Sequence, residues 1–349
     1  MAIKILGLKS FTGNPADGIN NFTLAVFGRL NKVNIRFFVS AYKGFKEFGS
    51  LEILKGLKLF FLLKERPDYL WGIGAPKEFF YLLFKPDRTK YVINFHTILI
   101  KKDGPWKVKT PWFLRKLLFS RADLIICPSE FSAQSVRKYF PDKEIVSILN
   151  GVDLNLFAPA KKNDRYLKKK YKVNFLKPIV VFVGTFQPRK RPDLFIKIAK
   201  NYQKANFVMV GRQIPPHDFL GSVNDLNNLQ WIEKMPREDI AVLFASSNIF
   251  VFPSLNEPSA AVILEAMASG CVPIISKSGG NPEFLKDGES GFLIDVNPQE
   301  KENFIKKIDL LIEDKTVWTK ISKNARLEAE KHSWDKVAQE YQNALIQNK

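Results

Sequence analysis

The chain contains few of the residues from which metal centres and disulfide frameworks are built. It has two cysteines, Cys127 and Cys271, and three histidines among its 349 residues. The cysteines lie far apart in apolar, strand-like stretches, and the histidines show no metal-ligand spacing. We therefore expect two buried free thiols, as is usual in a reducing cytosol, and no bound metal.

Long apolar runs are also missing. The longest apolar stretch, LFFLL at 59–63, is far shorter than the roughly 18 residues of a membrane span. The start, MAIKILGLKSFTGNPADG, has too short an apolar run for a signal peptide and reads as a strand and loop. These absences predict a cytoplasmic protein, either free or peripheral on the inner face of a membrane.

Several motifs of common enzyme classes are absent. No G-x-G-x-x-G follows the first strand-like run, and GIGAPK has only two of its glycines, which disfavours a nicotinamide dehydrogenase. There is no G-x-x-x-x-G-K-[ST] of a P-loop nucleotidase and no G-x-S-x-G nucleophile elbow.

Positive charge is in excess and is unevenly distributed. The net charge is +19, and residues 1–150 carry +13 of it, from 25 Lys and Arg against 12 Asp and Glu. Residues 151–349 carry +6, from 29 against 23. Such an excess suits an anionic partner, which could be a nucleic acid, an anionic membrane or an acidic substrate.

Apolar, strand-like runs alternate with segments of helical periodicity along the chain. Most runs are continuously apolar, as in strands buried on both faces of a parallel sheet. They are IKILGL, IRFFVS, YLWGI, YVINF, LIICP and IVSIL, then PIVVFVG, NFVMVG, IFVFP and VPIIS. The pattern predicts two doubly wound α/β domains with a boundary near 155–175. Ligands of such sheets bind beyond the carboxyl ends of the strands, here in a cleft.

Two glutamates bracket the small and apolar residues of NEPSAAVILEA. Pro258 and Ser259 are typical of a helix start, with the Ser259 side chain as its cap. Glu257 then precedes the helix, and Glu265 lies about two turns inside it, roughly 10–12 Å away along the axis. The helix N-terminus between them suits a phosphate. Such a pair also arises by chance, but this order matches a sugar, a diphosphate and a ribose.

Other loops after strand-like runs carry residues suited to the same ligand. Arg189, Lys190 and Arg191 lie in the turn of VFVGTFQPRKRPDLF, where they either neutralise a diphosphate or form a solvated basic turn. His96 follows YVINF as a site residue or as a structural histidine. The glycines of TGNPADG and SGGNPE permit close approach of the backbone to a ligand, or plain flexible turns.

EPSAAVILEAMASGCVPIIS followed by GGNPEFLKDGESGFLID closely resembles the motifs of the retaining GT-B glycosyltransferases of family four, the glycosyl transferases group 1. ADLIICPSEFSAQSVRKYF, the NGVD turn and VGTFQPRKRPDLF resemble them too, in the family's order. The resemblance covers nearly the whole chain. It implies two Rossmann-like doubly wound parallel-sheet domains that face a cleft: an acceptor-binding domain at 1–160, joined by a C-terminal helix at 334–349, and a nucleotide-sugar-binding domain at 170–330.

The resemblance also implies roles for single residues. Glu257 would contact the donor sugar, Lys190 would face the diphosphate, and His96 would lie near the reacting centre, so these are the candidate catalytic residues. Glu265 would bind the ribose. The implied donor-binding residues are Gly18, Thr185, Arg189, Lys190, Arg191, Ser259, Ala260, Ala261 and Glu265.

This sequence departs from the family pattern at a few of these positions. Thr185 stands where the family often has arginine, so either Arg189 or Arg191 would supply the missing charge or phosphate binding would be weaker. Ala260 stands where glycine is usual, and its methyl group narrows the sugar pocket. The glycine-rich first loop is sparse, with Gly18. Both carboxylates and the lysine remain, so we expect an active enzyme.

The implied activity is transfer of a hexose from a nucleoside-diphosphate sugar to a hydroxyl acceptor such as a lipid-linked or cell-surface glycan. The family proceeds with retention of configuration, without a required metal and with no cofactor besides the donor. One alternative is a non-catalytic nucleotide-sugar-binding subunit. Another is a nucleic-acid-binding protein, although no nucleic-acid module is visible. Donor base, sugar and acceptor stay open; we expect base selection near 211–218 and 231–239.

A basic, aromatic segment in the first half is a candidate for membrane docking. Residues 85–121 hold ten Lys and Arg against two Asp and Glu. The segment suits an anionic membrane surface, with aromatic side chains at the lipid interface, or a solvated basic helix whose apolar face joins the core. Its apolar residues are Trp106, Trp112, Phe113, Leu117, Leu118 and Phe119, and its central cations are Lys107, Lys109, Arg115 and Lys116.

Overall fold

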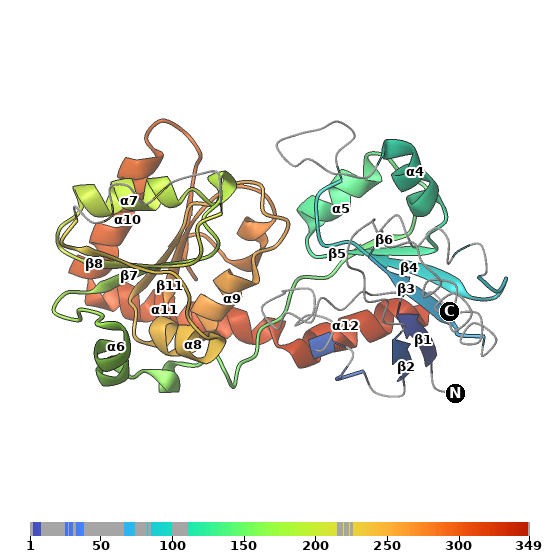
Figure 1. Cartoon of the computed structure of the whole chain (residues 1–349), viewed down its shortest axis with the longest axis horizontal. Coiled ribbons are helices and arrows are strands. Elements are labelled where there is room, and N and C mark those ends of the chain that lie inside the picture. Colours follow the sequence, from blue (N-terminus) through green and yellow to red (C-terminus); the bar gives the residue numbers. More distant parts are fainter. Residues whose placement is uncertain are drawn as a thin grey trace, which may run out of the picture. The chain divides into compact units, whose positions relative to one another are not determined.

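Figure 1 shows the computed structural model of the chain. It describes residues 3–7, 25–26, 28–30, 33–37, 66–73, 82, 85–99, 111–214, 219, 223 and 226–347. The chain divides by its contacts into two compact units, described separately below. Unit 1 comprises Met1–Leu149 and Trp334–Lys349, and unit 2 comprises Asn150–Ser333.

Unit 1 is built on a parallel sheet. In the described residues the sheet has six strands, in the order β2-β1-β3-β4-β5-β6. The strands are β1 (Ile3–Gly7), β2 (Val33–Phe37), β3 (Tyr69–Gly72), β4 (Lys90–Asn94), β5 (Leu124–Cys127) and β6 (Ile145–Ser147). The helices bounded in this unit are α4 (Trp112–Ser120), α5 (Glu130–Arg137) and α12 (Trp334–Gln347).

Alternate residues of these strands enter two different apolar cores, as expected for a sheet covered on both faces. Tyr91, Ile93 and Ile125 pack with Leu118 of α4 and Val136 of α5. The strand residues between them form the second core with α12; they include Tyr69, Trp71, Val92, Leu124 and Ile126 on the strands and Val337, Tyr341 and Leu345 on the helix. The last helix is therefore a structural part of unit 1.

Unit 2 has a second parallel sheet, in the order β12-β11-β10-β7-β8-β9 over the described residues. The strands are β7 (Ile179–Val183), β8 (Asn206–Val210), β9 (Leu229–Ile232), β10 (Ile249–Phe252), β11 (Val272–Ser276) and β12 (Phe292–Ile294). The α-helices are α6 (Asp164–Tyr171), α7 (Pro192–Asn201), α8 (Arg237–Ala245), α9 (Ala261–Ala268), α10 (Glu300–Glu313) and α11 (Lys315–Ala329). The short 3₁₀ helices are η1 (Pro159–Lys161), η2 (Pro188–Lys190), η3 (Asn281–Phe284) and η4 (Glu330–His332).

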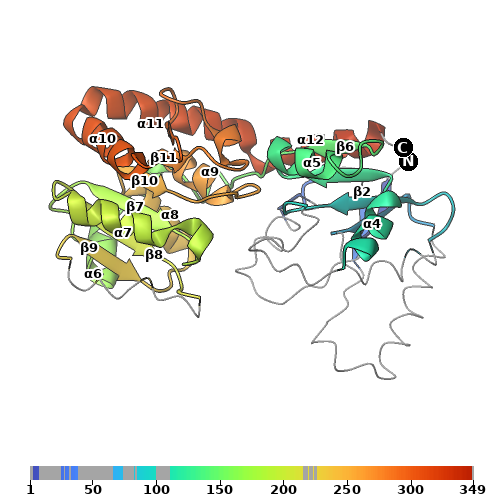
Figure 2. The same ribbon diagram turned by 90° about the horizontal axis from the view of Figure 1, so that it is seen from above.

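The strand order of unit 2 reverses between β7 and β10. From β7 the chain adds β8 and β9 on one side, and from β10 it adds β11 and β12 on the other. Helices α7 and α10 pack together, as do α8, α9 and α11, so helices cover both faces of the sheet (Figures 1 and 2). A doubly wound sheet binds its ligand at such a reversal, beside the carboxyl ends of the strands.

Every strand expected from an apolar run is present, and the predicted α/β class with two parallel sheets is confirmed. The sequence did not predict β9 or β12. Both lie at sheet edges; β9 is only partly buried, and the apolar run of β12 is only three residues long. Both cysteines are free and buried, as expected, and burial raises the pKa of the Cys127 thiol to about 12.

Of the segment singled out for membrane docking, residues 85–99 and 111–121 are described, and Trp106, Lys107 and Lys109 lie outside the described residues. Within α4, Leu118 and Phe119 are core residues and Arg115 is 6% exposed, whereas Phe113 is 67% exposed. In this part of the segment the apolar face therefore joins the core, and Phe113 and Lys116 remain exposed. No helix within the described residues has the length and apolar character needed to cross a membrane.

Candidate functional site

The loops that follow β7 and β10 meet at the strand-order reversal of unit 2. After β7 the backbone passes Gly184 and η2 and enters α7 at Pro192, which occupies the first helical turn. The loop after β10 lies against η2, since the Leu255 N–H donates to the Arg189 carbonyl at 2.7 Å. The neighbouring positions of β7 and β10 thus bring two segments together that are about seventy residues apart in sequence.

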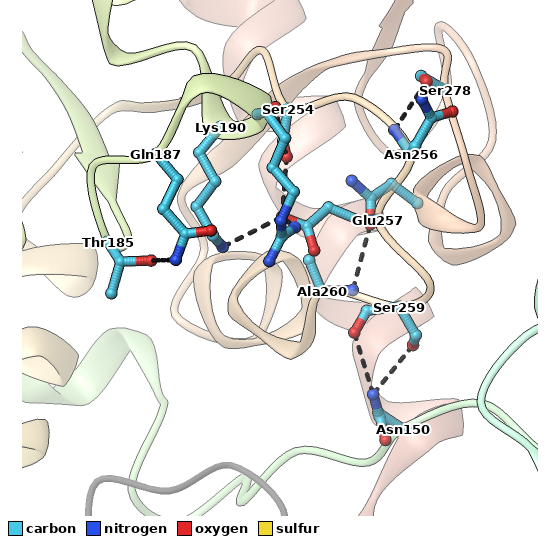
Figure 3. Close-up of polar contacts among 12 residues, drawn as sticks. Asn150, Thr185, Gln187, Lys190, Ser254, Asn256, Glu257, Ser259, Ala260 and Ser278 are labelled. Carbon is cyan, nitrogen blue, oxygen red and sulfur yellow. Dashed lines mark hydrogen bonds and ion pairs between the residues drawn. The ribbon is translucent and has the colours of Figure 1, made fainter. Parts of the chain in front are cut away.

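Glu257 is the centre of a charged cluster in these loops (Figure 3). It is 4% exposed. Lys190 Nζ lies 3.2 Å from Glu257 Oε1, Arg189 forms a second ion pair with the same oxygen, and the Ser254 hydroxyl donates to it at 2.8 Å. The structure therefore brings three of the predicted site residues, Arg189, Lys190 and Glu257, into one cluster. Two cations share one carboxylate, which leaves a net positive charge for an anion.

The burial of this cluster shifts the pKa of its members. Burial raises the pKa of Glu257, but Lys190, Arg189 and the Ser254 hydrogen bond outweigh burial and hold that pKa below its usual value. Burial lowers the pKa of Lys190; Glu257 opposes this effect and Arg189 adds to it. A lysine that is desolvated in this way interacts strongly with any negative charge placed beside it.

The stem of Lys190 is held on two sides. A Cβ atom at Gly184 would lie 3.3 Å from Lys190 Cδ, so the glycine leaves the room that the lysine occupies. The ammonium group lies 5.0 Å from the centroid of the Phe252 ring, at the end of β10. Both contacts come from strand ends, so the sheet itself sets where the charge lies.

The backbone around Glu257 is fixed by the loop after β11. Gly280 N–H donates to the Glu257 carbonyl at 2.8 Å. Gly279 has φ +69°, and a Cβ atom there would lie 2.4 Å from the Glu257 carbonyl oxygen. The buried Asn281 accepts a 3.1 Å hydrogen bond from Ala260 N–H through its side-chain oxygen. The glycine pair of SGGNPE is therefore required for close approach of backbone to backbone.

Helix α9 begins at Ala261, with Ala260 as its N-cap and no side-chain cap. The prediction that Pro258 and Ser259 start the helix was wrong, and so was the cap. The Ser259 hydroxyl and carbonyl instead accept hydrogen bonds from Asn150 Nδ2 at 3.0 and 3.2 Å. Gly270, with φ +79°, follows the helix end. The first N–H group of α9, at Ala261, lies just after Glu257 in the chain, whereas the N–H of the N-cap Ala260 already donates to Asn281.

The second carboxylate, Glu265, lies in the second turn of α9, nearer the helix start than expected. Arg237, at the start of α8, forms an ion pair with it, with Nη2 2.7 Å from Oε1. Burial raises the pKa of Glu265, and Arg237 opposes that rise. A carboxylate held by one guanidinium keeps further lone pairs with which to accept from hydroxyl groups.

Two of the predicted donor-binding residues have other contacts. Arg191 is the N-cap of α7 and pairs with the buried Glu300, with Nη1 2.7 Å from Oε2. The Ser276 hydroxyl donates to the same carboxylate at 2.6 Å. The charge of Arg191 is therefore neutralised away from Glu257, and Arg189 is the arginine that accompanies Lys190. Thr185 is exposed after β7 and accepts from Gln187 Nε2 at 3.1 Å.

His96 follows β4 in unit 1. Its Nε2 lies 2.8 Å from Asn94 Nδ2, and Asn94 Oδ1 accepts from the Tyr341 hydroxyl of α12 at 3.2 Å. The histidine is thus tied to the last helix of the chain within its own unit. Gly18 lies outside the described residues.

Several residues of the site were not found by sequence reasoning. Arg237, Asn150 and Asn281 are 21 to 109 positions away from the residues that they contact. The strand-end position of Asn281 was a signal, since it follows β11 and the glycine pair. Among the described residues, no group of His, Cys, Asp and Glu is arranged to hold a metal ion. Metal independence stays a prediction.

Comparison with known proteins assigns both parts of the chain. The family model described as "Glycosyl transferases group 1" matches residues 164–328, and that described as "Glycosyltransferase Family 4" matches residues 25–156. A curated relative, the UDP-Gal:alpha-D-GlcNAc-diphosphoundecaprenol alpha-1,3-galactosyltransferase of Escherichia coli, is 30% identical over 217 residues, which are 58% of this chain and 54% of the relative. The chain spans about half to two thirds of the length of the curated relatives it matches.

Solved structures show the same fold over the full length. A glycosyltransferase from Rickettsia africae ESF-5 has a TM-score of 0.79 at 19% identity, covering 99% of this chain and 98% of that one. Anabaena Alr3699/HepE in complex with UDP-glucose has a TM-score of 0.75 at 20% identity, covering 99% and 100%. With both family models matched and this fold, the chain belongs to the group 1 glycosyltransferases with the GT-B fold.

Proposed function

We propose that this protein transfers a hexose from a nucleoside-diphosphate sugar to a hydroxyl acceptor, with retention of anomeric configuration. The observation that carries the proposal is the Glu257 cluster. A buried carboxylate, two cations and a helix N-terminus lie together at the strand-order reversal, and a second buried carboxylate lies on the same helix. These groups match, in turn, the hydroxyls, the diphosphate and the ribose of such a donor.

The reaction breaks the bond between the anomeric carbon and the diphosphate oxygen. The acceptor oxygen forms its bond to that carbon on the same face, and its proton goes to the departing diphosphate. Negative charge grows on the diphosphate as the bond breaks. Lys190 and Arg189 stabilise it together with the N–H groups at the start of α9. Since these groups are positioned before the donor arrives, they reorganise little during the reaction.

Donor binding changes the partner of the two cations. Arg189 and Lys190 share the Glu257 carboxylate, so an arriving diphosphate becomes their second counter-charge. Glu257 can then accept hydrogen bonds from hydroxyl groups of the hexose. Glu265 accepts from the ribose hydroxyls, beside Arg237. His96 is assigned to the reacting sugar through the family resemblance alone.

Two relatives indicate which substrates to test first. The Escherichia coli relative is named for transfer of galactose from UDP-galactose to a diphosphoundecaprenol-linked sugar, and the Anabaena structure contains UDP-glucose. We therefore propose a UDP-hexose donor and a lipid-linked acceptor. A lipid-linked acceptor agrees with docking of the exposed Phe113 and Lys116, and of the preceding basic segment, on an anionic membrane.

The test uses the purified chain with UDP-, GDP- and ADP-hexoses, first by thermal shift and then by release of the nucleoside diphosphate. One donor is expected to raise the melting temperature of the protein. The protein should hydrolyse that donor slowly in water and release its nucleoside diphosphate faster when an acceptor is present. The anomer of the product is read by NMR. A donor that binds but is never consumed, with any acceptor, would establish the alternative of a non-catalytic nucleotide-sugar-binding subunit.

A further inference from the structure

The net positive charge of unit 2 comes from a single segment. Unit 2 carries 27 Lys and Arg against 21 Asp and Glu, a net charge of +6. Residues 161–177 carry eight Lys and Arg against one Asp, a net charge of +7. The rest of the unit therefore carries 19 against 20, a net charge of −1. Such a concentration of cations creates a local positive field that the rest of the unit lacks.

The cations form one stripe on helix α6. Arg165, Lys168 and Lys169 fall at i, i+3 and i+4, which is one face of α6, and Lys172 is the C-cap residue that follows the helix. All four are exposed. Within the described residues, the ion pairs of the segment are Lys162 with Asp164 and Lys170 with Asp239, neither of which includes a residue of this stripe. Lys168 and Lys169 lie in the last turn of the helix, where the helix dipole favours cations, whereas like charges at this spacing repel one another.

The opposite side of α6 is fixed to α8 through Asp239. The Tyr166 hydroxyl donates to Asp239 at 2.9 Å, the Tyr171 hydroxyl donates to the other oxygen, and Lys170 lies 2.7 Å from it. Leu167 is buried beneath them. The helix is therefore anchored on one side, and the charged stripe faces away from the unit on a rigid element.

An exposed leucine extends this stripe. Leu176 is 89% exposed, and the Lys177 ammonium next to it donates to the Gln203 carbonyl at 2.7 Å. Asn174 is tied to Asn206, the first residue of β8. The segment 172–177 therefore lies by the amino end of β8, whereas the Glu257 cluster follows the carboxyl ends of β7 and β10. A partner bound at this end of the sheet leaves the donor site of unit 2 open.

We propose that the α6 patch, made up of Arg165, Lys168, Lys169, Lys172, Leu176 and Lys177, docks unit 2 on an anionic lipid surface. Lysines supply point charges suited to the diffuse field of anionic headgroups, and an exposed leucine gains by entering the acyl boundary. Nucleic-acid sites use stacked aromatic rings and forked arginines, and the patch has one arginine and no exposed aromatic residue. The proposal is independent of the transfer reaction.

The test is co-sedimentation with vesicles of phosphatidylglycerol and phosphatidylcholine, and with pure phosphatidylcholine vesicles. The wild-type protein should bind the anionic vesicles, less so as salt rises. The variant K168S/K169S/K172S should bind roughly 100-fold less, about fivefold for each lysine. The variant K315S/K320S/K323S removes three exposed lysines from α11, the same charge in the same unit, and should bind nearly as the wild type. Leu176→Ser should lower the binding that persists at high salt.

Several outcomes would overturn the proposal. They are equal loss in both triple variants, no loss in the α6 variant, and equal binding of the wild type to neutral vesicles. If the variant K168S/K169S/K172S loses binding to RNA but keeps its binding to vesicles, the patch is assigned to nucleic acid instead. Melting curves for each variant separate loss of binding from loss of fold. A further variant, K107S/K109S/K116S, measures how much the segment at 85–121 contributes to vesicle binding. A loss of binding in that variant is therefore assigned to that segment and not to the α6 patch.

Discussion

Arg237 Nη2 lies 2.7 Å from Glu265 Oε1, so the carboxylate assigned to the ribose already has a cationic partner within unit 2. The guanidinium also lies over the Phe157 ring, 5.4 Å from its centroid, which holds it in place. Burial raises the pKa of Glu265, and the arginine opposes that rise. Arg237 therefore keeps Glu265 ionised over a wider range of pH, and an ionised carboxylate is the form that accepts from two hydroxyls.

Replacing Glu265 by glutamine should weaken binding of the nucleoside diphosphate. The amide keeps the shape of the side chain but loses one acceptor oxygen, at a cost of about 1–3 kcal/mol in binding free energy. Calorimetric titration with UDP, GDP and ADP measures the loss, with the exposed Glu289→Gln as the matched control. Unchanged affinity in a folded Glu265→Gln protein would remove the ribose assignment.

Nucleotide affinity should fall as the pH is lowered through the raised pKa of Glu265. The folded protein holds this proton more tightly than the unfolded chain does, so the carboxyl favours folding below its unfolded pKa, and that contribution is lost as the pH rises through the folded pKa. Nucleotide affinity has the opposite pH dependence and increases as the pH rises, because the ribose hydroxyls bind the ionised form of Glu265.

The Arg237→Met variant sharpens this test. Without the guanidinium the pKa of Glu265 should rise further, and the midpoint of the binding curve should move to higher pH. Titrations at a series of pH values above the ordinary pKa of a glutamate give the midpoint for each protein. The same midpoint in the wild type, in Arg237→Met and in Glu265→Gln would mean that another group controls binding.

The fold was predictable from the sequence because its signal is local. Each buried parallel strand is a continuous apolar run, so strands such as β7 and β10 can be recognised from a few residues. Edge strands lack that signal: β9 has one buried residue among four and was missed. Pro192 at the start of α7 is a local signal of the same kind, since its missing N–H costs nothing there.

The pairing of side chains was not predictable, because it depends on contacts across the fold. Three consecutive cations looked equivalent in the sequence, yet Glu300, more than a hundred positions away, takes Arg191 and leaves Arg189 with Glu257. Serine is a residue type favoured at helix N-caps, but Asn150 donates to the Ser259 hydroxyl and the helix starts two residues later. In both cases a partner distant in the sequence overrides the local preference of the residue, and the sequence spacing gives no indication of that partner.

Replacing Lys190 by methionine should lower kcat with little effect on the melting temperature. The thioether keeps the contact with Phe252, while the charge that stabilises the departing diphosphate is lost. A fall of roughly 100-fold or more is expected at saturating donor. The exposed Lys197→Met, on α7, is the matched control. A kcat near that of the wild type would transfer the role to Arg189.

Gly279→Ala should be far more damaging than Gly288→Ala. Both glycines have left-handed backbone, with φ of +69° and +73°. At Gly288 an added Cβ atom meets nothing within 4 Å, so the cost is backbone strain of about 1–2 kcal/mol. At Gly279 the same atom would lie 2.4 Å from the Glu257 carbonyl oxygen and must displace that loop.

For Gly279→Ala we therefore expect a loss of unfolding free energy of order 3–5 kcal/mol, with impaired donor binding in the protein that remains folded. Chemical denaturation of both variants measures the difference. Equal losses would mean that the Glu257 loop yields to the extra methyl group, and that its close contact with Gly279 is not needed to position the carboxylate.

The contacts of His96 give the last prediction. The Tyr341 hydroxyl donates to Asn94 Oδ1, which directs the Asn94 amide nitrogen to His96 Nε2. Burial raises the pKa of Tyr341 well above its ordinary value, so the hydroxyl stays a donor. With Nε2 accepting, the neutral imidazole carries its proton on Nδ1. Tyr341 is thus a positioning residue that acts on His96 through Asn94.

Replacing Tyr341 by phenylalanine should release the Asn94 amide and change the tautomer balance of His96. With three histidines in the chain, ¹⁵N NMR of the imidazoles can follow this, with His96→Gln to assign the signal. If His96 acts at the reacting sugar, kcat should fall severalfold and its pH profile should shift, while nucleotide affinity stays unchanged because the donor residues belong to unit 2. Tyr202→Phe removes a comparable hydroxyl bond, to Asp309, and serves as the control. An unchanged tautomer and pH profile would reduce Tyr341 to a packing role.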